Sequence, residues 1–402
     1  MLTCVPSSDP PLHPLSLEVL GRFRFDKSSV AQAWRAACPG AAVSLDEHLI
    51  SELPVVASKR LDRLLQERSA DLCQQLRPYL TAESIPAAWR NACDADVLTV
   101  DYAVIADPQS EAGWSIRLVE FQAFTSILAT SYLLHQAYSE IAPPLAQLRP
   151  WQMLPTQQHW LQATREWLCA GKSTAMLEHD HQQRATSFDL NASAALWDMP
   201  LLDPEDVELY SDQHIKNRLD GRTIERLCNR LILSEIAEQT ATISKLQQAH
   251  VEWQNHPGWY FAVNKGLAPH LHLQGEPKNA FAHQWRSLGL PASQLVAKNC
   301  FSFAGKDLLL HTTAQQLDAL PSAQDWLVQP RYQAYPLLRD EDGEPLFAEI
   351  RLMLQMKSGQ APWTAMQLLR WYRGDRASAS GFQGRFGEGL SVLYKPPQSD
   401  LN

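Results

Sequence analysis

The chain has 402 residues, of which 45% are hydrophobic and 20% charged, so it is long enough for two or three domains and too apolar for a disordered protein. Its formal net charge of -9 disfavours a nucleic-acid or anionic-membrane surface, because both need a basic face. Seven widely spaced cysteines without a CxxC pair favour a reducing compartment. With no signal-like N-terminus and no apolar run of about 18 residues, the sequence predicts a cytoplasmic protein.

Residues 1–95 are predicted to be a mostly helical region that follows an irregular, proline-rich arm. The segment VAQAWRAACPG (30–40) ends in Pro-Gly, which is typical of a helix stop. The segment 58–80 carries leucines at near-helical spacing. This region matches no functional motif, so we expect it to shape either an acceptor pocket or the interface of a homodimer.

Residues 96–150 begin with a change from helical spacing to runs that are typical of strands. VLTVDYAVIAD (97–107) and WSIRLVEFQAF (114–124) are β-branched and aromatic runs, and residues 109–113 between them are typical of a turn. We therefore predict an antiparallel hairpin, followed by a helix over ATSYLLHQAYSEI (129–141).

Residues 151–250 are predicted to form a small α/β domain. Strand-like runs at 173–180 and 206–210 enclose a helical run at 185–197, and the run 223–238 begins as a strand. This alternation is typical of a small parallel sheet.

Residues 251–395 are predicted to form a lobe of short strands with one helix at 312–320, and residues 396–402 are a polar tail. The expected strands are WYFAVNK (259–265), LVAKNCFSF (295–303), DLLLH (307–311), DWLVQPRYQ (325–333), PLFAEIRLML (345–354) and GLSVLY (389–394).

Two patterns that imitate known sites are better explained structurally. The run 171–174 (GKST) resembles the end of a phosphate-binding loop, but Glu166 stands where that loop needs glycine, and a helix precedes the run. Gly171 is therefore predicted to end a helix. The histidine pairs at 179/181 and 270/272 lack further ligands nearby in the sequence, so we interpret them as loop or strand histidines.

The most informative segment holds Asp101, Glu120 and Gln122. Residues two apart on a strand face the same side, so Glu120 and Gln122 project together, with Val119 and Phe121 on the other face. Asp101 approaches them across the hairpin, and two carboxylates with an amide oxygen are the hard ligands that Mg²⁺ prefers. A half-buried strand with an incidental salt bridge gives the same alternation, so the spacing leaves both interpretations open.

The pattern DYAVIAD, a turn and LVEFQAFTS resembles the hairpin of the circularly permuted ATP-grasp ligases, the group of eukaryotic glutathione synthetase and glutathionylspermidine or trypanothione synthetase. The resemblance implies an α+β, ATP-grasp fold and makes Asp101, Glu120 and Gln122 the magnesium ligands, with Gln122 where the family has asparagine. It covers roughly residues 95–395, and the segment 151–250 resembles the small α/β domain that permuted members place before the nucleotide-binding lobe.

Later segments resemble the parts of the family that bind ATP. Lys265 and Lys298 are similar to its two phosphate-contacting lysines, and a lysine within an apolar strand is costly unless it is paired. FSFAGKDL (301–308) stands where the family has its phosphate loop, which implies phosphate contacts for Ser302 and Gly305. This loop has fewer glycines than usual and lacks the glutamate found there in glutathione synthetase.

WLVQPRYQAYP (326–336) resembles the hinge strand that lines the adenine pocket, with Gln329 and Arg331 flanking it. On the strand FAEIRLML, Glu349 and Arg351 share one face. The resemblance implies a metal or ribose contact for Glu349 and a phosphate or acyl-phosphate contact for Arg351. A buried structural ion pair explains the same two residues.

The implied activity is that of an ATP- and Mg²⁺-dependent carboxylate–amine ligase. ATP phosphorylates a carboxylate, and an amine then attacks the acyl phosphate. The protein itself needs no nucleophile for these steps and acts by positioning the reactants and stabilising charge. The acid and the amine would be small molecules. A small-molecule kinase on the same scaffold, a non-catalytic nucleotide- or partner-binding relative, and a structural protein are the alternatives that the sequence leaves open.

Overall fold

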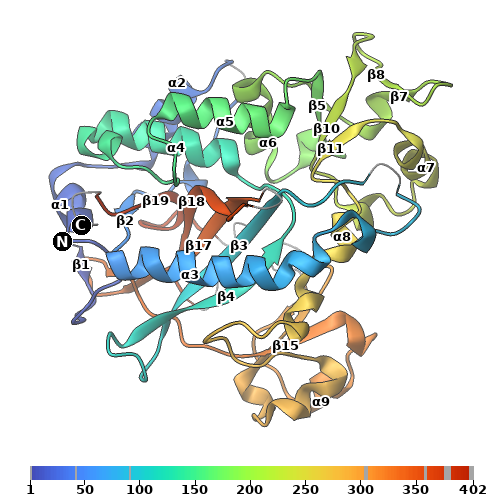
Figure 1. Ribbon diagram of the computed structural model, residues 1–402. Helices are drawn as coiled ribbons and strands as arrows, with labels where there is room; N and C mark the ends of the chain where they lie inside the picture. Colours follow the sequence, from blue (N-terminus) through green and yellow to red (C-terminus); the bar gives the residue numbers. More distant parts are fainter. Residues whose placement is uncertain are drawn as a thin grey trace.

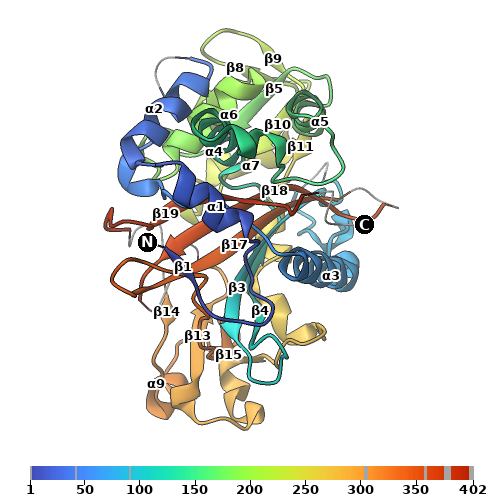
Figure 2. The same cartoon turned by 90° about the vertical axis from the view of Figure 1, so that its left-hand side faces the viewer.

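The computed structural model describes residues 2–40, 43–89, 92–302, 307–356, 360–374 and 382–397. A large central sheet occupies the middle of the molecule (Figure 1). A helix-rich part with a parallel sheet lies at one end, and a smaller lobe carrying β13, β15 and α9 lies at the other (Figure 2).

The central sheet joins strands from both ends of the described chain. Its strands are β1 (Thr3–Cys4), β2 (Val55–Val56), β3 (Val97–Ala106), β4 (Trp114–Gln122), β16 (Leu338–Arg339), β17 (Pro345–Gln355), β18 (Trp363–Tyr372) and β19 (Gly389–Tyr394). Strand β17 lies between β18 on one side and β16 and β3 on the other, and β4 pairs with β3. The antiparallel hairpin predicted from residues 97–124 is therefore confirmed.

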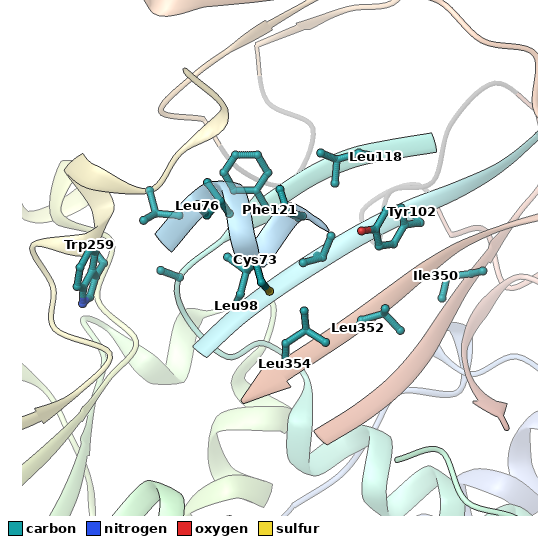
Figure 3. Close-up of a cluster of buried hydrophobic side chains, with 14 of the residues drawn as sticks. Cys73, Leu76, Leu98, Tyr102, Leu118, Phe121, Trp259, Ile350, Leu352 and Leu354 are labelled. Carbon is teal, nitrogen blue, oxygen red and sulfur yellow. The ribbon is translucent and has the colours of Figure 1, made fainter. Parts of the chain in front are cut away.

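One face of this sheet is covered by the long helix α3 (Lys59–Leu76). The helix starts at Ser58, whose side chain accepts a hydrogen bond from the Leu61 backbone at 3.2 Å, as N-capping residues do. Its Leu76 lies in the same buried cluster as Leu98 and Phe121 of the hairpin (Figure 3). This confirms the helix predicted from the leucine spacing of 58–80.

The opposite face packs against a second apolar cluster formed mainly by helices. These helices are α1 (Leu15–Arg22), α2 (Lys27–Ala37), α4 (Leu128–Ile141), α5 (Gln157–Cys169) and α6 (Ser187–Trp197). Along β17, Ile350 and Leu352 belong to the first cluster and Met353 to the second, so the strand alternates between two apolar environments.

A parallel sheet forms in this region, as predicted, but the expected strand at 206–210 is not part of it. It runs in the order β11 (Glu252–Gln254), β10 (Arg226–Asn229), β5 (Thr174–Leu177) and β6 (Leu201–Leu202), with every pair parallel. Gly171 follows α5 at a φ of 68°, as expected for a residue that ends a helix. The run 206–210 forms β7 (Val207–Leu209), which joins a separate meander with β8 (Ile215–Asn217) and β9 (Thr223–Ile224).

The smaller lobe has its own sheet and its own core. Its antiparallel sheet runs β12 (Ala280–Phe281), β15 (Trp326–Pro330), β13 (Leu295–Asn299) and β14 (Leu308–Leu309). Trp285, Leu295, Leu317 and Val328 belong to a buried cluster separate from the two around the central sheet. Helix α9 (Ala314–Asp318) confirms the helix predicted at 312–320, and it begins with a capping box.

Two segments differ from the sequence-based expectation. The run WYFAVNK, predicted as a strand, forms α8 (Trp259–Ala262), and a 3-10 helix then covers Lys265–His270. A short apolar run carries no periodicity that distinguishes helix from strand, which explains this error. Strand β18 was not predicted. The remaining α-helix within the described ranges is α7 (Thr240–Gln248).

Candidate functional site

A cavity of about 850 Å³ opens between the central sheet and the smaller lobe. Its walls come from β4, β17 and β18 on the sheet side and from β13, β15 and the turn around Ser302 on the lobe side. Seven of the residues singled out in the sequence line it: Glu120, Lys265, Lys298, Ser302, Gln329, Arg331 and Glu349.

An extra residue in β4 aims the hairpin at this cavity. Asp101 pairs with Glu120 and Tyr102 pairs with Leu118, so Val119 is inserted as a β-bulge. Leu118 and Phe121 consequently both belong to the apolar cluster on the α3 side (Figure 3), whereas Val119 and Glu120 lie outside that cluster and line the cavity. The expectation that Val119 shares a face with Phe121 is therefore wrong, because a bulge interrupts the simple alternation of the strand.

Asp101 is held by two arginines rather than exposed to the cavity. Its side chain is 1% exposed, and its two oxygens accept from Nε and Nη2 of Arg351, both at 2.7 Å. Nη2 of Arg370 donates to Asp101 Oδ2 at 2.5 Å. Burial alone would raise the Asp101 pKa, but the two guanidinium groups together lower it to about 2.

Arg370 also connects Asp101 to Glu349. The same nitrogen, Nη2, donates to Glu349 Oε2 at 2.7 Å, and both Arg370 and Glu349 line the cavity. Burial raises the Glu349 pKa to about 7, although Arg370 opposes the shift. Sequence reasoning missed Arg370 because the strand that carries it was not predicted; the run WTAMQLLRWY (363–372) is nonetheless long and apolar enough for a buried strand.

The two lysines approach the cavity from the lobe side. Nζ of Lys298 donates to the backbone oxygen of Val119, the bulge residue, at 3.0 Å. Burial lowers the Lys298 pKa, and the charges of Glu120 and Glu349 oppose that shift. Lys265 lies at the start of a 3-10 helix instead of a strand end. Its Nζ donates to the backbone oxygen of Ser302 and lies 3.9 Å from Glu120 Oε2.

The remaining predicted residues are placed differently. Gln122 pairs with Thr99 and is 8% exposed, and it is not among the residues that line the cavity. Gly305 lies outside the described residues. Gln329 on β15 donates from Nε2 to Asn279 Oδ1 at 3.2 Å, and Nη1 of Arg331, just after this strand, lies 3.0 Å from His311 Nδ1.

The charges around the cavity favour an anionic ligand. Three carboxylates line the cavity, Glu120, Glu276 and Glu349, and they are outnumbered by five cations, Arg117, Lys265, Lys298, Arg331 and Arg370. A surplus of positive charge at a partly buried site attracts phosphate or carboxylate groups. The cation-rich wall is thus suited to a phosphorylated ligand.

The same residues fit a divalent cation only when it arrives with such a ligand. Within the described ranges, no group of three or more His, Cys, Asp or Glu side chains is placed to hold a metal ion. Three carboxylates line the cavity, and two of them, Glu120 and Glu349, lie near Lys298. Mg²⁺ in nucleotide sites is usually held by one or two carboxylates together with phosphate oxygens and water, and this donor set satisfies that requirement.

Comparison with known proteins shows the fold. No protein-family model matches the sequence, and no curated protein matches it. Among solved structures, a glutathione synthetase-like effector (GSS30) from Globodera pallida, in its apo form, covers 98% of this chain and 99% of its own, with a TM-score of 0.57 and 11% sequence identity. The chain shares the fold of that protein. At this identity the likeness concerns the fold alone, and the chemistry rests on the cavity.

None of the helices within the described ranges is long and apolar enough to cross a membrane.

Proposed function

We propose that this protein is an ATP-grasp enzyme that binds ATP with Mg²⁺ in the cavity and activates a small-molecule carboxylate for attack by an amine. The observation that carries the proposal is the meeting of seven residues, drawn from separate parts of the chain, around one cavity of about 850 Å³. Cavities of several hundred cubic ångströms are typical of small-molecule and cofactor sites. The whole-chain likeness to a glutathione synthetase-like protein supports the same fold assignment.

The lobe side of the cavity suits a nucleoside. Apolar side chains of the lobe line it beside the polar backbone of β15, and these side chains are Leu290, Val296, Leu308 and Leu310. A purine ring needs such flat apolar contact together with a few backbone groups that read its edge. We assign the adenine to this side, next to Gln329 and Arg331.

The phosphates would then point toward the lysines. Lys265 and Lys298 lie near Glu120, at the junction of lobe and sheet, where they would neutralise the charge of the transferring phosphoryl group. Glu120 and Glu349 would hold Mg²⁺ against the phosphate oxygens. The bound Mg²⁺ would further offset negative charge on the phosphates and keep them in place.

Of the two arginines that hold Asp101, Arg370 is the one that lines the cavity, so we assign the acyl-phosphate contact to it. Arg351, the residue suggested by the sequence, is not among the lining residues; it binds Asp101 with two nitrogens and donates to Ser126 Oγ at 3.1 Å. We therefore assign Arg351 a positioning role: it fixes Asp101, which in turn orients Arg370.

A non-catalytic nucleotide-binding protein is the second candidate. Both carboxylate oxygens of Asp101 accept hydrogen bonds from Arg351 and Arg370. Asp101 is therefore not available as one of the three magnesium ligands that the sequence suggested. The structural neighbour is described as an effector, and that description does not require turnover. A small-molecule kinase uses the same residues and differs only in its product.

Isothermal titration of ATP, with and without Mg²⁺, tests the proposal. Wild type should bind, Lys298→Ala should weaken binding about tenfold or more, and Lys216→Ala on β8, outside the cavity, should behave as wild type. ADP release that depends on both an acid and an amine would identify a ligase; ADP release with an acid alone would identify a kinase. Tight ATP binding without turnover would leave the non-catalytic candidate, and no ATP binding by the folded wild type would contradict all three.

A cytoplasmic setting, a homodimer and the absence of nucleic-acid or membrane partners belong to the same proposal. Small-angle scattering or analytical ultracentrifugation measures the oligomeric state directly.

A further inference from the structure

A second cavity, of about 480 Å³, adjoins the first at Phe301 and Ser302 and is lined mainly by aromatic and aliphatic groups. Its lining residues are Trp89, Leu233, Ser234, Ala237, Ile243, Gln247, Tyr260, Phe261 and Phe301. The mechanism described above uses none of them. The apolar character of this wall contrasts with the charged wall of the first cavity.

The aromatic rings around this cavity are partly exposed, which costs free energy unless a ligand covers them. Phe261 is 45% exposed and Phe301 is 36% exposed, although both are large apolar side chains. Tyr260 contacts both rings, with ring centroids 5.2 Å from Phe261 and 5.8 Å from Phe301. The three rings therefore form one continuous aromatic wall.

The two cavities share the turn that carries Phe301 and Ser302. Phe301 lines the apolar cavity, whereas Ser302, the next residue, lines the charged one. On the facing segment, Phe261 lines the apolar cavity and Lys265, four residues later, lines the charged one. Nζ of Lys265 donates to the backbone oxygen of Ser302, so a direct hydrogen bond joins the two segments at the boundary.

We propose that the apolar cavity holds the side group of the acid substrate, which would be a carboxylic acid bearing an aryl or similarly bulky apolar group. The aromatic wall would cover that group, and the carboxylate would extend past Ser302 toward Lys265 and the phosphates. A cavity of about 480 Å³ accommodates one or two aromatic rings. This inference rests on the proposed function and names the substrate class for the same site.

Binding of 3-phenylpropionate, compared with propionate, tests the inference by isothermal titration in the presence of ATP, Mg²⁺ and the full chain. Wild type should bind 3-phenylpropionate at least about tenfold more tightly than propionate, because a buried phenyl group adds favourable transfer free energy. Phe261→Ala and Phe301→Ala should each reduce that preference about threefold to tenfold. Ala237→Phe, which fills the cavity, should abolish the preference.

Phe386→Ala is the matched control. Phe386 is also 45% exposed but is not among the residues lining this cavity, so its removal should leave the preference unchanged. ATP titration of every variant separates the two proposals. If ATP binds normally while wild type shows equal affinity for the two acids, or if Phe261→Ala and Phe386→Ala behave alike, the apolar subsite is wrong and the nucleotide site stands. If ATP does not bind, the proposed function fails first.

Discussion

Arg370 connects Asp101 to Glu349 and is the residue on which the charge balance of the cavity wall depends. The two carboxylates are 1% and 7% exposed, and each accepts a hydrogen bond from Arg370 Nη2. A buried carboxylate that loses its partner retains the full cost of desolvation. The arginine therefore stabilises the fold and shapes the site at the same time.

Replacing Arg370 by alanine should lower the free energy of unfolding by about 3–5 kcal/mol, because Asp101 and Glu349 would lose a shared buried partner. Urea denaturation measures the change. Arg286→Ala is the control, since Arg286 pairs with Asp318 at 2.7 Å on the exposed surface of the lobe, where solvent screening leaves an ion pair with little effect on stability. Equal losses in the two variants would show that the Arg370 network is no more important to stability than a surface pair.

Glu349 gives the molecule a pH-dependent stability. Its pKa in the folded protein is about 7 against an ordinary value of 4.5, so the folded state holds the proton more tightly than the unfolded state. This group consequently lowers the free energy of unfolding as pH rises from about 4.5 to about 7, and its contribution levels off above that range.

Glu349→Gln should remove that contribution. Urea denaturation at pH 5 and pH 7.5 should show a smaller loss of stability for the variant than for wild type over this interval. Glu276, whose pKa burial also raises to about 7, remains in both proteins and cancels in the comparison. Identical pH profiles would mean that the fold does not raise the pKa of Glu349.

At the scale of the element, the bulge in β4 decides where the hairpin presents its polar groups. Val119 is the inserted residue, and its backbone oxygen accepts the Lys298 hydrogen bond. Without it, Leu118 and Glu120 would become neighbours in a regular strand, with Leu118 and Phe121 still facing α3. We therefore expect the bulge to matter for the contact with Lys298 rather than for packing against α3.

Deleting Val119 should leave a cooperatively folded protein and weaken ATP binding about tenfold, because Lys298 loses the acceptor that positions it. Deleting Ser115 from the regular part of the same strand is the control. It places Trp114 and Ile116, both buried, next to each other and forces one of them off the apolar face. If the Val119 deletion unfolds the protein as severely as the Ser115 deletion, the bulge is part of the core packing.

At the scale of the whole molecule, the two chain segments that lead into and out of the smaller lobe are hydrogen-bonded to the central sheet or to α3, in addition to the Lys298–Val119 contact. In the first, the Glu276 carboxylate accepts from the Leu118 backbone at 2.9 Å and the Asp71 carboxylate from the Gln274 backbone at 2.9 Å. In the second, the Ala106 backbone donates to the Gln333 oxygen at 2.9 Å. The lobe has a separate core, so it is the unit most able to open without unfolding the sheet.

Hydrogen exchange should detect this division. Amides of β13 and β15 should exchange faster than those of β17, and ATP should slow them, because the proposed nucleotide site lies between the lobe and the sheet. Thr313→Ala removes the capping box of α9 and should cost about 1 kcal/mol within the lobe. Exchange in that variant should rise in β13 and β15 and stay unchanged in β17; a uniform rise would show that lobe and sheet unfold as one unit.

The sequence by itself determined the elements with strong local patterns. Three local patterns each predict a structure that forms: the leucine repeat of α3, the β-branched runs of β3 and β4, and the strand followed by a helix in residues 173–197. The sequence also identified the residue types of the site, since Glu120, Lys298 and Glu349 are polar groups within otherwise apolar strands. Local patterns of this kind are set by side chains close together in the chain, and they can be recognised without knowing the fold.

Only the tertiary structure decided how those residues are used. The β4 bulge, the two arginines around Asp101 and the α8 helix in place of a strand all depend on partners more than a hundred residues away or on packing that no short run encodes. Arg351 and Arg370 reach Asp101 across 250 and 269 residues of chain, respectively. Because a carboxylate behaves as a ligand or as half of an ion pair according to such distant neighbours, its role emerges only when the strands are assembled.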